Sequence, residues 1–198
     1  MNISIILAHP TEGSFNHAIA QAAAERLEAN GHTATIHDLY REKFDPMLEA
    51  GEIASGSGLP DDIARRCREI AAADGIIIVH PNWWGQPPAI LKGWTDRVLR
   101  TGVAYEFKVV DGQGVLNGLL KARAAIVFNT SNTDDAVERD DFGDTLDMIW
   151  KKCVFGFCGL TNVHRRNFSV VIASTEQQRK AWLDEVAKTV DTYFPAGK

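Results

Sequence analysis

The chain has 198 residues, enough for one domain with a sizeable core, and we expect residues 1–198 to form a single domain. A formal net charge of −5, without a basic cluster, argues against a nucleic-acid partner or an anionic membrane surface. The three cysteines lack the spacing of a metal site or a disulfide framework, no apolar run could span a bilayer, and no signal-peptide pattern is present. We therefore expect a cytoplasmic protein that inserts into no membrane and holds no metal.

The first part of the chain predicts a strand, a helix and a second strand. Residues 3–8 are almost all apolar, and residues 33–39 also have the composition of a strand. Ser14 can cap the helix between them, and Asn30-Gly31 is typical of a helix end. Because a β-α-β unit crosses over in the right-handed sense, the two strands should be parallel.

The middle of the chain is organised around one buried strand. Residues 49–60 are rich in Gly and Ser and predict a mobile surface loop, and residues 61–73 predict a helix. The apolar run at 76–79 is short and β-branched, which is typical of a strand buried on both faces. The next helix should begin at Pro88, because proline suits the first helical turn.

The second half continues the alternation of strands and helices. Five strands alternating with helical segments predict an α/β fold, with a doubly wound parallel sheet and helices on both faces. The remaining expected elements are a hairpin around Asp111-Gly112, a strand at 124–129, a solvated acidic loop at 134–141, a helix across 146–155, a strand at 167–172 and a helix from Thr175 to about 194.

Three strand ends carry residues that suit a flat, phosphorylated ligand. The carboxyl ends of neighbouring strands meet at one edge of such a sheet, where ligands bind. The first end leads into a helix N-terminus, which favours a phosphate group. The second end offers indole faces for stacking, and the third offers short polar groups for a ring edge. The candidate residues are His9, Ser14, Phe15 and Asn16 at the first end, Pro81, Asn82, Trp83 and Trp84 at the second, and Asn129, Thr130, Ser131 and Asn132 at the third.

Each strand end also has a purely structural interpretation. Ser14 could serve only as a helix cap and His9 as a structural histidine. Trp83 and Trp84 could pack against a neighbouring helix, and Asn, Thr and Ser are ordinary turn residues. The chain has neither a GxGxxG motif nor a Walker sequence, so a standard dinucleotide or P-loop site is not supported. The combination of the three ends fits a flavin better than any one of them does.

Several segments resemble the flavodoxin-like NAD(P)H:quinone oxidoreductases of the DT-diaphorase type, and the resemblance covers nearly the whole chain. This family also includes the modulators of drug activity and the ancillary subunits of potassium efflux systems. The segments that carry the resemblance are Leu7-Ala8-His9, Ser14-Phe15-Asn16, Asp38-Leu39-Tyr40, Phe44-Asp45-Pro46, Pro81-Asn82-Trp83-Trp84, Pro88-Ala89-Ile90-Leu91-Lys92-Gly93-Trp94, Phe142-Gly143-Asp144 and Phe157-Cys158-Gly159.

The resemblance implies a flavodoxin-like fold and a non-covalent flavin, FAD in preference to FMN, reduced by NAD(P)H and reoxidised by a quinone. The first strand end would then hold the phosphate and ribityl chain, the second would line the isoalloxazine, and the third would touch its polar edge. A homodimer is also implied, with Trp94, Trp150, Phe155 and Phe157 as candidate interface aromatics or, alternatively, core residues.

The chain departs from the family around the substrate side. The family has Thr-Thr-Gly-Gly where this chain has Asn129-Thr130-Ser131-Asn132, and Phe142 stands at the position of a histidine that stabilises charge on the reduced flavin. No catalytic residue is therefore assigned. Besides the oxidoreductase, two other functions stay open: a flavin-binding regulatory subunit of a transporter, and an electron-transfer flavoprotein.

Overall fold

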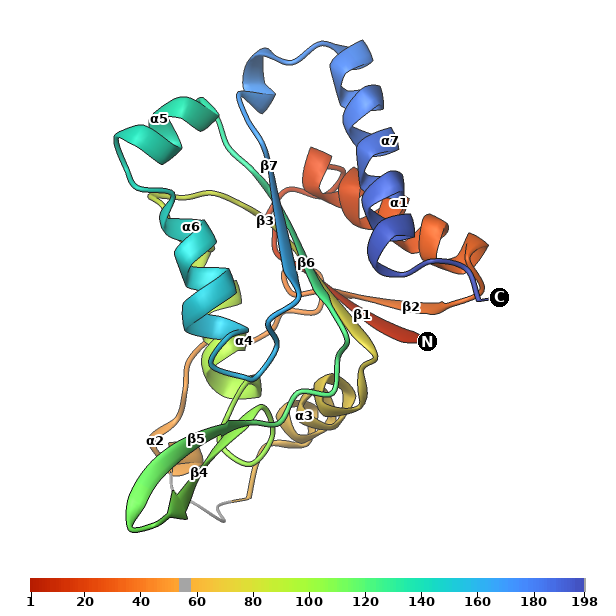
Figure 1. Ribbon diagram of the computed structural model, residues 1–198. Coiled ribbons are helices and arrows are strands. Elements are labelled where there is room, and N and C mark those ends of the chain that lie inside the picture. The colour runs from red at the N-terminus through yellow and green to blue at the C-terminus, as the bar shows by residue number, and fades with distance from the viewer. Residues whose placement is uncertain (54–57, 198) are drawn as a thin grey trace.

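A parallel sheet of five strands forms the centre of the computed structural model, which describes residues 1–53 and 58–197 (Figure 1). The strand order is β2-β1-β3-β6-β7, and every neighbouring pair is parallel. This order confirms the predicted doubly wound fold and makes β1 and β3 neighbours at the switch point. The strands are β1 (Asn2–Leu7), β2 (Thr33–Asp38), β3 (Gly75–Pro81), β6 (Ala125–Thr130) and β7 (Val163–Phe168).

Helices cover both faces of the sheet, as the sequence predicted (Figure 1). Successive residues of β3 alternate between the two cores: Ile76 and Ile78 pack on one face, while Ile77 and Val79 pack on the other. Burial on both faces explains why this strand is uniformly apolar. The first face is covered by α3 (Asp61–Ala72), α4 (Ala89–Val98) and α6 (Thr145–Met148), and the second by α1 (Phe15–Ala29) and α7 (Glu176–Tyr193).

Most of the aromatic residues considered for a subunit interface belong to the core of this chain. Helix α6 continues into a π-helical segment, Ile149–Val154, that turns Trp150 inward. Trp94, Trp150 and Phe155 are at most 1% exposed, so the core alternative is correct for them. Phe157 is 37% exposed and packs edge-to-face on Tyr105, with 4.8 Å between the ring centroids.

Gly93, in the segment 88–94, is required for a steric reason. A Cβ atom at Gly93 of α4 would lie 2.2 Å from the carbonyl oxygen of Pro46. The loop after β2 therefore runs directly against the helix at this point, and only glycine permits that approach. This contact fixes α4, which follows the turn at the end of β3.

The predicted hairpin is confirmed and stands apart from the main sheet (Figure 1). It consists of β4 (Tyr105–Val110) and β5 (Gln113–Gly118), paired antiparallel. Asp111 and Gly112 form the turn with φ values of 52° and 77°, as the Asp-Gly sequence predicts. The start predicted for the last helix is also confirmed, and Thr175 forms a capping box with Gln178 at the N-terminus of α7.

The position of the last strand was predicted wrongly. The apolar residues near 170 suggested a strand at 167–172, but β7 spans Val163–Phe168. Val170 adopts a left-handed φ of 55°, which turns the chain, and Ile172 is 81% exposed. The sequence of β7 is polar, so it lacks the apolar pattern by which the other strands were predicted. Its polarity is tolerated in the fold because Arg165 pairs with Asp144 and Arg166 pairs with Glu185.

Two predicted loops are partly helical. The acidic segment contains α5 (Asp135–Asp140), because Asp134 accepts a 2.8 Å hydrogen bond from the Ala136 amide and so caps a helix. The segment 49–60 contains α2 (Ala50–Ile53), fixed by a buried ion pair of 2.6 Å between Glu52 and Arg97. Residues 54–57 of that predicted mobile loop lie outside the described residues.

Candidate functional site

The three candidate strand ends meet at the carboxyl edge of the sheet. The Asn82 amide donates a 2.6 Å hydrogen bond to the Thr130 carbonyl, which joins the second end to the third. The Asn16 side-chain amide donates to Thr130 Oγ1 at 3.0 Å, which joins the first end to the third. Thr130 is thus the shared partner, and residues from three distant parts of the sequence form one surface.

The loop after β1 leaves hydrogen-bond donors available. Ser14 occupies the N-cap position of α1 but does not cap the helix with its side chain, contrary to expectation. Within the described residues, the Phe15 and Asn16 amides have no backbone acceptor, and the N-terminus of a helix attracts anions. Asn16 is 3% exposed, and its Oδ1 atom lacks a protein partner. The two backbone amides of this loop can therefore accept a phosphate without losing an existing bond.

The Phe15 side chain points away from this surface. Its ring packs edge-to-face on Phe168 and tilted on Trp182, with centroid distances of 6.2 and 5.7 Å. Of this residue, only the backbone amide faces the candidate phosphate position. Phe15 therefore anchors α1 to α7 through its ring and offers its N–H to a ligand.

His9 is half-buried beside the same loop. Its Nδ1 atom accepts a hydrogen bond of 3.1 Å from the Thr11 amide. Burial lowers the pKa of His9, and the neighbouring His17 acts in the same direction. His9 therefore orders the loop and is neutral over most of the physiological range.

The turn after β3 presents two tryptophans. Pro81 is the last residue of the strand, and Trp83 and Gln86 exchange two backbone hydrogen bonds of 3.0 Å across a tight turn. Trp84 at the tip has a left-handed φ of 58° and is fully exposed, while Trp83 is 42% exposed. Neither indole is a buried packing residue, and the turn offers both faces to an aromatic ligand.

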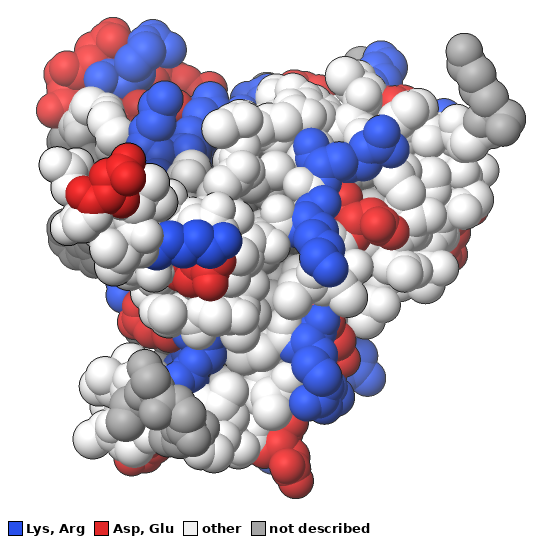
Figure 2. All heavy atoms as spheres, turned by 60° about the horizontal axis from the view of Figure 1, so that its bottom comes forward, with Lys and Arg blue, Asp and Glu red and all other residues white. Residues whose placement is uncertain are grey.

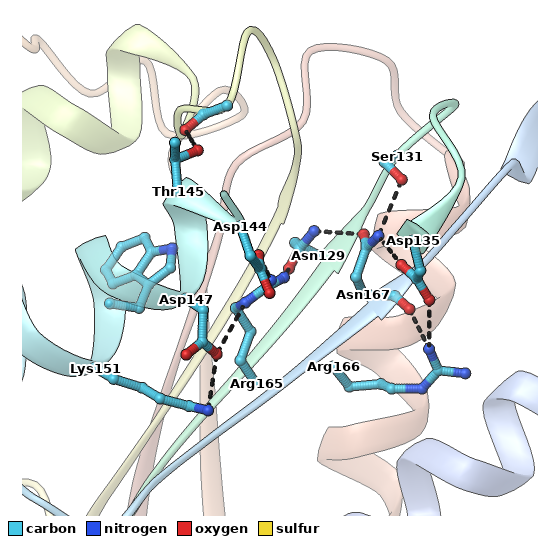
Figure 3. Close-up of polar contacts among 12 residues, drawn as sticks. Asn129, Ser131, Asp135, Asp144, Thr145, Asp147, Lys151, Arg165, Arg166 and Asn167 are labelled. Atoms are coloured by element: carbon cyan, nitrogen blue, oxygen red, sulfur yellow. Dashed lines mark hydrogen bonds and ion pairs between the residues drawn. The ribbon is translucent and has the colours of Figure 1, made fainter. Parts of the chain in front are cut away.

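The Thr145 hydroxyl fixes this turn from the neighbouring helix. It donates a 2.7 Å hydrogen bond to the Gly85 carbonyl (Figure 3). A Cβ atom at Gly85 would lie only 2.6 Å from the same hydroxyl oxygen, so a glycine is needed there. Helix α6 thus determines where Trp84 stands.

The side chains after β6 are mostly used by the protein itself (Figure 3). Asn129 is fully buried, donating to Asn167 at 2.6 Å and accepting from Arg165 at 2.7 Å. Ser131 accepts from Asn167 at 3.0 Å and donates to the Thr133 carbonyl at 2.7 Å. Asn132 accepts a 3.1 Å bond from the Ile172 amide. These groups hold the loop in shape. The Ser131 backbone is also bonded within the protein, its amide to the Phe168 carbonyl and its carbonyl to the Val171 amide, which leaves Thr130 and the backbone of residue 132 to border the site.

Arg165 is the centre of this polar network. Its side chain is 7% exposed, bonds to Asp144 and lies 3.5 Å from Asp147, which also pairs with Lys151 at 2.7 Å (Figure 3). Asp144 precedes Thr145 at the start of α6. The network thus links β7 to the turn that carries Trp84, and it borders a crevice of about 220 Å³ that also reaches Asn82.

Sequence reasoning missed His80, which supports the turn from below. The Trp150 indole N–H donates to His80 Nε2 at 3.0 Å, and the other ring nitrogen lies 2.8 Å from the Pro81 carbonyl. His80 is fully buried, and desolvation lowers its pKa to about 4. The only signal in the sequence was its place between a buried strand and the aromatic turn.

Sequence reasoning also missed His17 and Asp38. The Ser14 hydroxyl lies 2.8 Å from His17 Nδ1, and His17 Nε2 lies 3.0 Å from an Asp38 carboxylate oxygen. The three residues line a crevice of about 780 Å³ between α1 and β2. The signal was available, because position 17 lies three residues after Ser14 on one helical face.

The residues present fit a flavin. Unpartnered helix amides and a turned-away Ser14 suit a phosphate, and the exposed indoles suit a fused ring. The buried Oδ1 atoms of Asn16 and Asn82 have no protein partner, as expected of groups that await a ligand. Across residues 1–53 and 58–197, no three metal-binding side chains gather, and no helix is long and apolar enough to cross a membrane.

Comparison with known proteins agrees with this geometry. The chain is 36% identical over 205 residues to an NAD(P)H oxidoreductase of Haemophilus influenzae, covering 99% of this chain and 97% of that protein. It is 30% identical over 214 residues to mouse ribosyldihydronicotinamide dehydrogenase [quinone], covering 97% and 91%. The solved NAD(P)H:quinone oxidoreductase of Methanothermobacter marburgensis aligns with a TM-score of 0.79 at 27% identity, covering 96% and 94%.

A model of the family described as having the flavodoxin-like fold matches residues 1–190. The match spans nearly the whole chain and agrees with the observed strand order and with the three converging loops. The resemblance to flavodoxin-like NAD(P)H:quinone oxidoreductases is therefore confirmed, and the chain belongs to this flavodoxin-like family.

Proposed function

We propose that the protein is a flavin-dependent oxidoreductase that passes two electrons from NAD(P)H to a quinone or a related acceptor. The observation that carries this proposal is the joining of three loops through Thr130, with free helix amides at one end of the surface and exposed indoles at the other. The names of the relatives from Haemophilus influenzae, mouse and Methanothermobacter marburgensis support the same activity.

In this proposal the chain binds and orients, and the bound flavin supplies the hydride chemistry. The Phe15 and Asn16 amides and the Ser14 hydroxyl hold the phosphate, with His9 ordering their loop. Pro81, Asn82 and the two indoles line the ring system. Thr130 and the backbone of residue 132 contact its polar edge, while Asn129 and Ser131 act indirectly by fixing the loop.

We propose FAD as the flavin, on the strength of the family resemblance, with FMN as the alternative. Both flavins carry a phosphate that suits the N-terminus of α1. They differ in the adenosine half, so binding of each to the purified protein distinguishes them directly. Isothermal titration with FAD and FMN should give tighter binding for FAD, and tighter binding for FMN would reverse the assignment.

We also propose a homodimer, supported by the apolar hairpin. Phe107 and Val109 are 64% and 79% exposed, and neighbouring exposed apolar side chains are typical of an interaction surface. A two-stranded hairpin outside the main sheet is also only marginally stable unless something packs against it. The hairpin borders a crevice of about 710 Å³, and this end of the molecule has broad uncharged areas between separate charged side chains (Figure 2). Light scattering should report a dimer for the parent protein and a monomer for Val109→Glu.

The three cysteines are free, which is compatible with the expected cytoplasmic location.

An absorbance spectrum tests the main proposal. The protein is mixed with FAD or FMN, desalted and examined for flavin bands near one equivalent. The bands should bleach with NAD(P)H and return when a benzoquinone is added. Flavin that is retained but not bleached would favour a carrier or a regulatory subunit, and no retention of either flavin would overturn the proposal.

A further inference from the structure

The phosphate loop contains no cation of its own. Residues 9–16 include one acid, Glu12, and neither Lys nor Arg. A flavin phosphate carries negative charge, and the N-terminus of α1 offers only about half of a compensating positive charge. Two histidines can add positive charge beside this loop: His9 at its start and His17 on α1, whose rings lie edge-to-face with centroids 6.3 Å apart.

The hydrogen bonds of His17 define where its proton is. Both Asp38 oxygens act as acceptors, Oδ1 from the Arg41 amide at 3.2 Å and Oδ2 from the His17 ring at 3.0 Å. His17 Nε2 must therefore carry a hydrogen and donate it to Asp38. In a neutral imidazole the other nitrogen, Nδ1, is then a bare acceptor.

In this tautomer of His17, the hydroxyl hydrogen of Ser14 must point toward the imidazole ring. With Nδ1 bare, the 2.8 Å contact between Ser14 and His17 exists only if the hydroxyl donates to the ring. The remaining lone pairs of Ser14 Oγ cannot bond to a phosphate oxygen, which is also an acceptor. If Nδ1 gains a proton, the direction reverses: the ring donates to Ser14, and the hydroxyl hydrogen becomes free for the phosphate.

We infer that His17, positioned by Asp38, takes up one proton when the flavin phosphate binds to Ser14, so that flavin retention depends on pH. The inference rests on the proposed flavin site. The proton comes from solvent, is added to His17 Nδ1, and leaves an imidazolium between the Asp38 carboxylate and the phosphate-bound hydroxyl. His17 supplies the cation that the loop sequence lacks, and it acts on the ligand through Ser14.

The other charged or titratable groups around His17 do not replace it as the site of proton uptake. Asp38 lies on β2, and Arg41 and Glu42 line the same crevice from the following loop. Arg41 is charged at every physiological pH, so it cannot account for the uptake of a proton. Glu42 is already paired with Arg66 at 2.6 Å. His9 faces His17 from the loop itself, and its pKa is lowered by burial, so it adds no fixed charge near neutral pH.

Proton uptake can be measured directly. FAD is titrated into the protein at pH 7.5 in buffers of different ionisation enthalpy, and the slope of the binding enthalpies gives the number of protons taken up. FAD is the main probe because its diphosphate does not titrate in this range, whereas the FMN monoester loses a proton near pH 6. We expect up to one proton per FAD, and an affinity that falls by up to about tenfold per pH unit on the alkaline side.

Three variants and one ligand serve as controls. His17→Gln should bind FAD without proton uptake and with little pH dependence. Asp38→Asn should shift the pH profile of the affinity to lower pH, because the cation loses its carboxylate. His32→Gln, at a histidine that bonds to the carbonyls of Phe194 and Pro195, should behave like the parent protein. Riboflavin, which has no phosphate, should bind the parent protein without proton uptake.

The outcomes separate this inference from the proposed function. FAD binding by the parent protein without proton uptake overturns the role of His17 alone. Equal uptake by His17→Gln does the same and would point to His9. Failure of FAD, FMN and riboflavin to bind at all would overturn both the flavin site and the inference built on it.

Discussion

The loop after β1 and the loop after β6 lie at the same edge of the sheet, and both consist of short polar residues. They use those residues in different ways. The first loop leaves two backbone amides and the Oδ1 atom of Asn16 without protein partners. In the second loop, the side chains of Asn129, Ser131 and Asn132 form hydrogen bonds within the protein. The first loop is organised to receive a ligand, whereas the second is a scaffold whose polar groups are mostly bonded within the protein.

The largest expected effect comes from breaking the scaffold at Arg165. Arg165→Met leaves the buried Asn129 oxygen and the Asp144 carboxylate without their donor. We expect the free energy of unfolding to fall by about 3 kcal/mol, because the buried Asn129 oxygen and the partly exposed Asp144 carboxylate both lose a charged donor. Urea denaturation measures this loss. Arg139→Met, which removes an exposed pair with Asp140, should cost less than about 1 kcal/mol; equal losses would show that the network is not a scaffold.

Acid should act in opposite directions on the buried histidine at the end of β3 and on the loop after β1. The pKa of His80 is about 4 in the folded protein, against about 6.5 in an unfolded chain. Between these values the unfolded chain binds the proton more readily than the folded protein does. The contribution of neutral His80 to the free energy of unfolding is therefore fully present above pH 6.5, and about 3 kcal/mol is lost as the pH falls to 4. Flavin retention, in contrast, should improve as pH falls.

Unfolding curves at several pH values test this difference. His80→Gln should show a shallower decline between pH 6.5 and 4 than the parent protein, because the variant lacks the titrating group. Parallel declines in the two proteins would mean that other groups govern the acid sensitivity.

A matched pair of asparagine variants compares the two loops directly. Asn129→Ala should lower the unfolding free energy by about 2 kcal/mol, because buried partners lose their bonds, and should change flavin affinity by less than about threefold. Asn16→Ala should cost about 1 kcal/mol of stability and weaken flavin binding about tenfold. Denaturant curves and flavin titrations on both variants give the four numbers. The comparison fails if Asn129→Ala has the larger effect on binding.

The sequence predicted the sheet well because a strand buried on both faces must be apolar, as residues 76–79 are. It failed for β7, whose arginines are satisfied by Asp144 and Glu185, residues that only the fold brings near. The same limit applies to the site. The sequence predicted that polar residues at three strand ends would lie together, and the fold brings them to one edge. A sequence cannot show whether Asn129 turns toward a ligand or toward Arg165, nor that His17 meets Asp38.

The smallest expected effect is a gain in stability at the tip of the aromatic turn. Trp84 and Gly85 have φ values of 58° and 68°, the conformation that Asn-Gly prefers in a two-residue turn. Because Trp84 is fully exposed, no packing is lost in Trp84→Asn, and the free energy of unfolding should rise by about 0.5–1 kcal/mol. The variant should also bind flavin or quinone more weakly, because it lacks the stacking face. Thermal unfolding and ligand titration measure the two effects. A tryptophan retained in a strained, solvent-exposed position is best explained by a ligand, and a variant that is both more stable and fully able to bind would contradict that explanation.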